Sequence, residues 1–231
     1  MSLRIYRIFH YTYKLYIGKN KKRVMEKLFS YAMVAYILLL AAYLLYGQGL
    51  MALDLALSQS VFSSLFPAIY IFNVITNLGT IVVFMIVSLW LIHRGNKKEG
   101  LILFVSLWID LAINFLLKNI FIRERPAYFD PNIWSLEPNG PLSFPSGHAQ
   151  RAFLVATILS KYFKRDRMLL YAFAVLIGIS RIAVGAHYAL DVIVGALNGI
   201  VLGSLLLRFP WDKYAKFTQK QAQPSVHKLK R

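Results

Sequence analysis

Six long apolar runs occupy most of this chain of 231 residues and limit what it can fold into. They cover approximately Leu28–Tyr46, Ile69–Ile92, Leu101–Phe121, Gly147–Phe163, Met168–Ala183 and Tyr188–Leu207. Each run approaches the ~20 residues that a helix needs to cross the hydrocarbon core of a bilayer. The runs therefore predict an all-α fold, a bundle of six transmembrane helices.

The composition excludes an ordinary soluble domain. Hydrophobic residues make up 58% of the chain and charged residues 16%, whereas a soluble domain carries about 25% charged residues. The formal net charge of +17 does not indicate nucleic-acid binding, because the basic residues lie between the apolar runs rather than on one polar domain. The chain contains no cysteine, which excludes disulfides and thiol chemistry.

The distribution of lysine and arginine predicts the orientation of the chain. These residues are dense before the first run, in the second and fourth connections and after the sixth run, and the first connection has none. Because basic connections remain in the cytoplasm, we expect both termini there and the first, third and fifth connections outside. The third connection departs from this rule, since Lys118, Arg123 and Arg125 lie in or beside it. Either a short basic cluster is tolerated there, or these side chains hold an anion.

Three parts of the chain differ in polarity. Residues 1–27 are basic and aromatic, with Arg4, Arg7 and Lys14 on one side of a helical wheel. This pattern predicts an interfacial amphipathic helix and not a cleavable signal peptide. Residues 28–209 are expected to form the six-helix membrane domain, and residues 210–231 a basic cytoplasmic tail.

Two further features are expected at the membrane surface. A weaker apolar segment, Leu50–Phe66, contains Asp54 and four serines and is interpreted as an interfacial or re-entrant piece. Tyr128, Phe129 and Trp134 lie in the third connection, where they could anchor it in the interface or contact a lipid chain.

Polar residues within the apolar runs need partners. Asp110 lies midway along the third run, where a lone carboxylate is costly. Arg151 is its candidate partner. Asn114 and Asn198 are interpreted as hydrogen-bonding links between helices rather than as catalytic groups.

Three short motifs fall at the predicted outer ends of the helices. They are Lys118 with Arg125-Pro126, then Pro145-Ser146-Gly147-His148, and then Ser180-Arg181 with His187 and Asp191. The three cations Lys118, Arg125 and Arg181 would repel one another. A bound phosphate would relieve this repulsion, and arginine would donate forked hydrogen bonds to its oxygens.

The second motif precedes the fourth run. Proline or serine is favourable at the start of a helix, where free N–H groups and the helix dipole form an anion site. Gly147 would allow the backbone to approach a phosphate oxygen, and His148 could donate a proton. A turn followed by a helix cap would explain this motif equally well by itself.

The third motif places His187 and Asp191 four residues apart at the start of the sixth helix, one turn apart on one face. The carboxylate can hold one ring nitrogen and leave the other as a nucleophile. Alone, the two residues could be a satisfied helical pair, and Lys118 and Arg125 could be cations that snorkel to the interface. The presence of all three motifs on one face favours a single phosphate-reactive site.

Together the motifs resemble the signature of the type 2 phosphatidic acid phosphatase superfamily, which also contains glucose-6-phosphatase and the vanadium haloperoxidases. Every fixed position of the signature is matched in order and spacing. The resemblance covers the second half of the chain by motif and the first half only through the helix layout. It implies phosphate binding by Lys118, Arg125, Arg181, Ser146 and Gly147, and catalysis by His187 as nucleophile, His148 as acid and Asp191 as the group that orients His187.

The resemblance implies a metal-independent membrane phosphatase without a cofactor. Its expected partners are the bilayer and a lipid phosphate or diphosphate, namely a polyprenyl diphosphate, phosphatidylglycerol phosphate or phosphatidic acid, with a slight preference for the first. The site is expected on the extracytoplasmic side of the cell membrane. The intermediate that the resemblance implies is a phosphohistidine at His187. Three alternatives remain open: a lipid phosphotransferase that uses the same phosphohistidine, a non-catalytic anion-binding membrane protein, and a phosphatase of soluble substrates.

Overall fold

The computed structural model describes residues 30–31, 33–38, 40–42, 51–130, 132–133, 135–136 and 140–211. These residues are mostly helical and contain no strand apart from an isolated bridge between Glu124 and Leu142. The predicted all-α class is therefore confirmed for the described part of the chain. The amphipathic helix expected in residues 1–27 and nearly all of the expected tail lie outside it.

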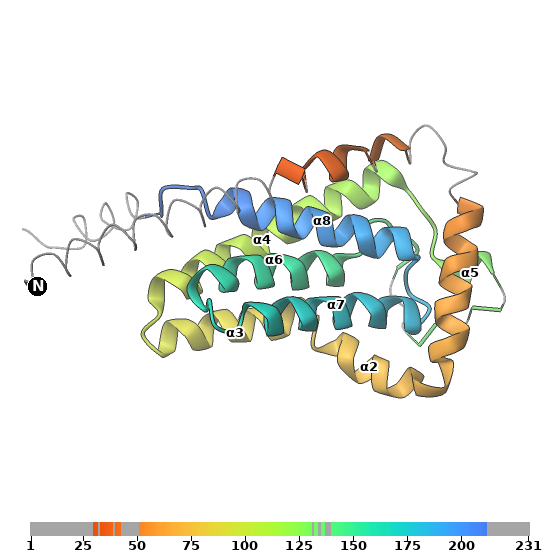
Figure 1. The fold of residues 1–231 in the computed structure, drawn as a ribbon, viewed down its shortest axis with the longest axis horizontal. Helices are drawn as coiled ribbons and strands as arrows, with labels where there is room; N and C mark the ends of the chain where they lie inside the picture. Colours follow the sequence, from red (N-terminus) through yellow and green to blue (C-terminus); the bar gives the residue numbers. More distant parts are fainter. Residues whose placement is uncertain are drawn as a thin grey trace, which may run out of the picture.

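The helices drawn from yellow to blue lie side by side in a bundle, and a further helix crosses one end of it (Figure 1). The crossing helix, residues 51–65, is drawn in orange, and the α5 label beside it belongs to a short helix behind it. The elements that follow it are η1 (Phe66–Ala68), α2 (Ile69–Asn77), α3 (Ile81–His93), α4 (Lys97–Phe121), α5 (Pro126–Phe129), α6 (Gly147–Tyr162), α7 (Arg167–Ala183) and α8 (Ala189–Leu206). We call the crossed end of the bundle, where α4 and α7 end and α6 and α8 begin, the capped end.

The helix α6 lies at the centre of the bundle, in contact with α4, α7 and α8. Its buried apolar side chains, such as Leu154 and Ile158, pack with Leu103 of α4 and Ile177 of α7. Its contact with α8 leaves no room for a side chain at Gly199, where a Cβ atom would overlap the backbone oxygen of Gln150. Only a residue without a side chain allows two helices to approach this closely.

Three described helical runs are long and apolar enough to cross a membrane: Met51–Asn77, Lys97–Phe121 and Ala189–Leu206. The helices α3, α6 and α7 have 13, 16 and 17 residues, fewer than the ~20 residues of a full span. The number of six spans and the cytoplasmic position of both termini therefore remain predictions.

The second apolar run, expected as one helix over Ile69–Ile92, is divided. Its first part, α2, continues the helical run that begins at residue 51, and α3 begins only after a turn at residues 78–80. Thr80 has an extended conformation (φ −70°, ψ 153°), which ends one helix and starts the next. The prediction of a continuous span is thus wrong. The segment interpreted as interfacial or re-entrant is the helix of residues 51–65, which crosses the capped end (Figure 1).

Candidate active site

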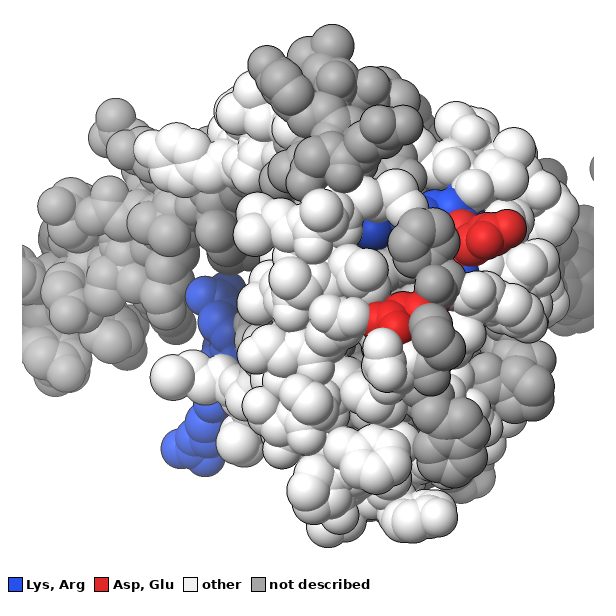
Figure 2. All heavy atoms as spheres, turned by 90° about the vertical axis from the view of Figure 1, so that its right-hand side faces the viewer, with Lys and Arg blue, Asp and Glu red and all other residues white. Residues whose placement is uncertain are grey.

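All three sequence motifs meet at the capped end of the bundle. Lys118 belongs to the last turn of α4 and Arg181 to the last turn of α7, while Ser146 precedes α6. His187 and Asp191 lie on either side of the first residue of α8. Seen from this end, the described surface is mostly uncharged, with small basic and acidic areas close together (Figure 2). Most of the predicted site residues are buried, Arg181, His187 and Asp191 among them.

The start of α6 is buried inside the bundle, since Ser146 and Gly147 are both buried. Ser146 occupies the N-cap position that its type favours, but its hydroxyl makes no capping hydrogen bond. Among the described residues, its Oγ atom is buried and has no hydrogen-bond partner. An anion at the helix start could accept a hydrogen bond from this hydroxyl and from the free backbone N–H groups.

Backbone carbonyls of the connection between α5 and α6 hold two of the predicted phosphate-binding cations. Lys118 Nζ donates hydrogen bonds to the carbonyl oxygens of Leu142 (2.8 Å) and Ser143 (3.1 Å). Arg125 Nε donates to the carbonyl oxygen of Gly140 (2.8 Å), and Arg125 Nη1 donates to that of Ala186, next to His187 (2.9 Å). These bonds hold both cations in place. Their charge is not neutralised, because a backbone carbonyl carries no net charge.

Arg181, the third cation, is held by a residue that sequence analysis missed. Its Nη1 atom donates a hydrogen bond of 2.6 Å to Thr76 Oγ1 in α2, and both residues are buried. The contact depends on the division of the second apolar run, which brings α2 against α7. A threonine within an apolar run was the only signal in the sequence.

His187 and Asp191 make the predicted contact, in a different local geometry. His187 precedes α8 and does not belong to it, and its Nδ1 atom lies 3.3 Å from Asp191 Oδ2. The same oxygen accepts a hydrogen bond from the backbone N–H of Tyr188 (3.0 Å). Asp191 therefore caps α8 and orients the imidazole with one oxygen. The Nε2 atom of His187 is the ring nitrogen that does not face this carboxylate.

The surroundings of His187 favour its neutral form. Burial lowers the pKa of His187 well below its usual value, and the positive charges of Arg181, Arg125 and Lys118 lower it further. A neutral imidazole is the form that can act as a nucleophile. Lys118, Arg125 and Arg181 are thus the cations whose charges act on this ring.

His148 lies in the first turn of α6 and is partly exposed. It lies at the capped end with Arg181 and His187, and the charges of these two residues act on its ring. A Cβ atom on Gly79, in the turn between α2 and α3, would lie 3.2 Å from His148 Cδ2. The turn that divides the second apolar run therefore forms one wall beside this histidine.

Arg123, the third basic residue of the external cluster, binds protein carboxylates. Its guanidinium contacts Asp54 Oδ2 and Asp191 Oδ1, both at 2.8 Å. Arg123 thus differs from Lys118 and Arg125, whose partners given above are backbone carbonyls. Sequence analysis did not connect Asp54 with this arginine.

A buried polar network lies behind the start of α6. The predicted pair is present, since Arg151 Nε lies 3.2 Å from Asp110 Oδ2. Gln150 joins this network, because its Nε2 atom donates a hydrogen bond to Asp110 Oδ1 (2.8 Å). Its Oε1 atom accepts hydrogen bonds from Asn114 (3.0 Å) and Asn198 (2.8 Å). The interpretation of both asparagines as links between helices is confirmed.

The buried polar network leaves no space for a side chain at Gly147, even when no ligand is bound. A Cβ atom there would lie 2.8 Å from Arg151 Nη2 and 2.9 Å from Asn114 Oδ1. The expected close approach of the backbone at Gly147 is therefore made to protein atoms that support the site.

The aromatic residues of the third connection are only partly described. Tyr128 is exposed, while Trp134 and the side chain of Phe129 lie outside the described residues. A hollow of about 560 Å³ lies between the helix of residues 51–65 and Ile133, lined partly by Gln59 and Phe62. Its lining includes none of the predicted site residues.

The arrangement can hold a tetrahedral oxyanion beside a nitrogen nucleophile. Three cations and a helix start supply positive charge and hydrogen-bond donors. The imidazole of His187 is oriented from behind by a carboxylate, and a second imidazole, that of His148, lies in the first turn of α6 at the same end of the bundle. These are the groups required for a transfer of phosphate through a covalent intermediate.

The sequence profile of the PAP2 superfamily matches residues 99–215. The matched range contains all residues of the three motifs, whereas Asp54 and Thr76 lie before it.

Similar proteins include two relatives and a solved structure. A protein of Arabidopsis thaliana named "Probable lipid phosphate phosphatase beta" is 33% identical over 133 residues, which are 46% of this chain and 62% of that protein. Phosphatidylglycerophosphatase B of Bacillus subtilis is 32% identical over 161 residues, 63% of this chain and 76% of that protein. The crystal structure of Aquifex aeolicus LpxE matches the fold with a TM-score of 0.63 and 32% sequence identity. The match covers 68% of this chain and 96% of that one.

Proposed function

This chain belongs to the PAP2 superfamily, and we propose that it is an integral membrane phosphatase that hydrolyses a lipid phosphate or diphosphate. The observation that carries the proposal is the buried imidazole of His187, which has a carboxylate at Nδ1 and three cations around it. The names of its relatives, a lipid phosphate phosphatase and a phosphatidylglycerophosphatase, support the same class of substrate.

In the first step, His187 Nε2 attacks the phosphorus atom of the substrate. An N–P bond forms while the bond between phosphorus and the lipid oxygen breaks. His148, which is protonated when the phosphate anion of the substrate binds beside it, gives its proton to that oxygen. Lys118, Arg125 and Arg181 stabilise the charge on the phosphoryl oxygens, together with the Ser146 hydroxyl and the Gly147 N–H. Asp191 stabilises the positive charge that the ring of His187 acquires.

In the second step, water attacks the phosphorus atom of the phosphohistidine. His148 now accepts a proton from this water, the N–P bond breaks and inorganic phosphate is released. A lipid or other acceptor in place of water would make the protein a phosphotransferase.

The proposed chemistry does not require a metal ion. Lys118, Arg125 and Arg181 already supply the positive charge that a divalent cation supplies in metal-dependent phosphatases, and they would repel such a cation. EDTA should therefore leave the rate unchanged, and vanadate, which imitates five-coordinate phosphorus, should inhibit. A strict requirement for Mg²⁺ would contradict this proposal.

Exposed apolar side chains near the site support a lipid substrate. Exposed apolar side chains such as Ile122 and Phe115 lie on or just after α4, near the capped end. A lipid chain could remain in the membrane beside them while its phosphate enters the site. We propose that the site opens on the extracytoplasmic side, as the distribution of basic residues predicts.

The test is phosphate release by the purified full chain from four substrates in mixed micelles. These are a polyprenyl diphosphate, phosphatidylglycerol phosphate, phosphatidic acid and glucose 6-phosphate, which tests the soluble class. We expect turnover of at least one lipid and none of the sugar. His187→Asn should reduce kcat by about 10⁴-fold or more, as loss of a covalent nucleophile does.

The matched control is His93→Asn, because His93 is exposed at the last turn of α3 and away from the motif residues. This variant should keep the activity of the wild type. A wild type that binds vanadate but releases no phosphate from any substrate would favour the anion-binding alternative. Transfer of labelled phosphate to a second lipid would favour the phosphotransferase.

A further inference from the structure

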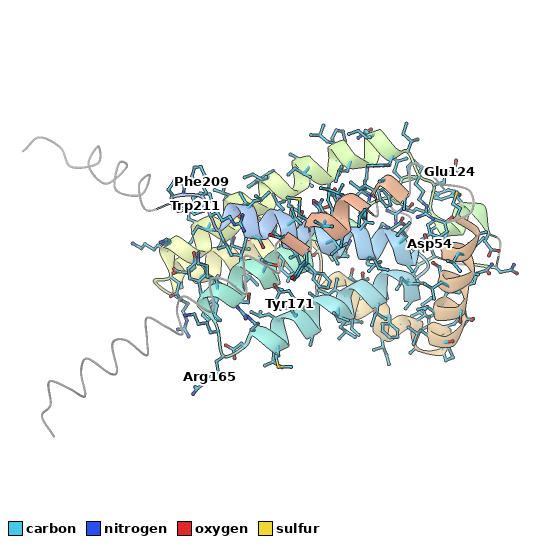
Figure 3. The ribbon with its side chains drawn as sticks, turned by 45° about the horizontal axis from the view of Figure 1, so that its top comes forward. Asp54, Glu124, Arg165, Tyr171, Phe209 and Trp211 are labelled. Atoms are coloured by element: carbon cyan, nitrogen blue, oxygen red, sulfur yellow. The ribbon has the colours of Figure 1, made fainter. Side chains whose placement is uncertain are left out.

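The helix of residues 51–65 is attached to the start of α8 by two polar side chains one turn apart. Asp54 Oδ1 accepts a hydrogen bond from the backbone N–H of Leu190 (2.8 Å). Ser58 Oγ accepts one from the N–H of Ala189 (2.9 Å). The first N–H groups of a helix have no partner within the helix, so these bonds satisfy them. Figure 3 labels Asp54 where this helix meets α8.

Arg123 extends this attachment to the catalytic carboxylate. Its Nη2 atom contacts Asp54 Oδ2 and its Nη1 atom contacts Asp191 Oδ1, each at 2.8 Å. The guanidinium carbon also lies 3.8 Å from the centre of the Tyr188 ring, which fixes the plane of the fork. The side chains of the three charged residues are at most 6% exposed. Asp191 is therefore held at Oδ1 by Arg123 and faces His187 with Oδ2.

The backbone before Arg123 indicates that this contact is strongly favoured. Ile122 has φ 42° and ψ 48°, the left-handed conformation that β-branched residues rarely adopt. Its side chain is 68% exposed, so packing of Ile122 in the protein core does not account for the conformation. The turn directs Arg123 into the bundle, where its two ion pairs offset the strain.

We infer that Asp54 and Arg123 are positioning residues of the reaction, which act on His187 through Asp191. The inference rests on the proposed function. Two carboxylates and one guanidinium leave this group with a net negative charge beside His187 Nδ1. That charge stabilises the positive ring that forms when Nε2 attacks phosphorus. Without Asp54, the full positive charge of Arg123 would act on Asp191 alone.

The first variant is Asp54→Asn, which removes the charge and keeps an oxygen for the N–H of Leu190. We expect kcat to fall by about 10-fold to 100-fold, the range found for supporting partners of metal-bound histidines. KM and inhibition by vanadate should not change, because the phosphate-binding groups are intact. The rate at which ³²P appears on the protein after an alkaline quench should fall by the same factor.

The matched control is Ser58→Ala, which removes the other link between the same two helices without a change in charge. It should keep the kcat of the wild type. A purely structural role of the attachment predicts instead that both variants lose activity together with thermal stability.

Arg123→Gln tests the route of the effect. If Asp54 acts through Arg123, the variant Asp54→Asn/Arg123→Gln should have the same kcat as Arg123→Gln. If Asp54→Asn does not fold, Arg123→Lys carries the test, because lysine keeps the charge but cannot bridge both carboxylates, and kcat should fall while KM stays. The inference is overturned if the losses multiply, if kcat is unchanged, or if Ser58→Ala behaves like Asp54→Asn. Absence of phosphate release by the wild type would instead refute the proposed function.

Discussion

Arg151 Nε lies 3.2 Å from Asp110 Oδ2, and this ion pair joins α6 to α4 one turn after His148. Gln150 Nε2 donates a second hydrogen bond to the same carboxylate, at Oδ1 (2.8 Å). The side chain of Asp110 is fully buried and that of Arg151 is 11% exposed. The pair thus fixes the depth at which α6 begins, and with it the position of Ser146, Gly147 and His148.

Asp110→Ala should destabilise the protein, because it leaves the Arg151 guanidinium buried without its carboxylate. Loss of one partner of a buried pair costs about 3–5 kcal/mol, and the partial exposure of Arg151 favours the lower part of this range. Thermal unfolding in detergent micelles measures the effect. The variant Asp110→Ala/Arg151→Met should lose less stability than Asp110→Ala alone, since no uncompensated charge remains. Equal losses in both variants would argue against the pair.

Ser146→Ala should separate activity from stability. The Oγ atom of Ser146 is buried without a partner among the described residues, so its removal should leave the thermal stability of the ligand-free protein unchanged or raise it. Its hydrogen bond to a charged phosphate oxygen would be worth about 1.5–3 kcal/mol. We therefore expect a loss of roughly 10-fold to 100-fold in kcat/KM.

The control for this prediction is Ser106→Ala in α4. Ser106 is also buried, but its hydroxyl donates to the carbonyl oxygen of Ile102 (2.6 Å). This variant should leave kcat/KM unchanged. A loss of stability in Ser146→Ala as large as in Ser106→Ala would show that the Ser146 hydroxyl has a structural partner.

The stability of the wild type should decrease as the pH falls below about 6.5. The pKa of His187 is lowered in the folded protein by burial and by Arg181, while in the unfolded chain it has its ordinary value. Below that value the unfolded chain binds a proton that the folded protein does not, so acid favours unfolding by up to about 1.4 kcal/mol per pH unit. At a pH above the ordinary pKa of histidine, His187 is neutral in both states and its contribution to the pH dependence of stability disappears.

His187→Gln isolates this contribution. Thermal unfolding of both proteins is measured at pH 7.5, 6.5 and 5.5. The stability of the wild type relative to the variant should decline between pH 6.5 and pH 5.5. Parallel curves would mean that His187 titrates normally in the folded protein.

Much of the site could be predicted from sequence because its members occur in short motifs. His187 lies just before α8 and Asp191 in its first turn, so a separation of four residues is enough to bring them together. The pair of Asp110 and Arg151 was also predictable, since each needs a partner in an apolar run and both lie at a similar depth.

The contacts that support the site from outside the motifs were not predictable. Asp54 is 69 residues from Arg123, and Thr76 is 105 residues from Arg181. Both contacts depend on the helix of residues 51–65 crossing the bundle and on the turn at residues 78–80. Hydropathy alone does not reveal that turn, because the stretches on both sides of it are mostly apolar. The sequence shows Asp54 in the first connection and Arg123 in the third, but no pattern in the sequence indicates that the two residues form an ion pair.

Thr76→Val tests whether the division of the second apolar run serves the phosphate site. Valine keeps the volume of threonine but cannot accept the hydrogen bond that Arg181 Nη1 donates to Oγ1 (2.6 Å). The guanidinium should then be less well aligned with phosphate, so we expect vanadate to bind about 10-fold more weakly, as loss of a hydrogen bond to a charged group predicts. Thr157→Val is the matched control, because Thr157 is buried in α6 and its hydroxyl bonds to the carbonyl oxygen of Phe153 (2.7 Å). If both variants bind vanadate like the wild type, Thr76 has no part in the alignment of Arg181.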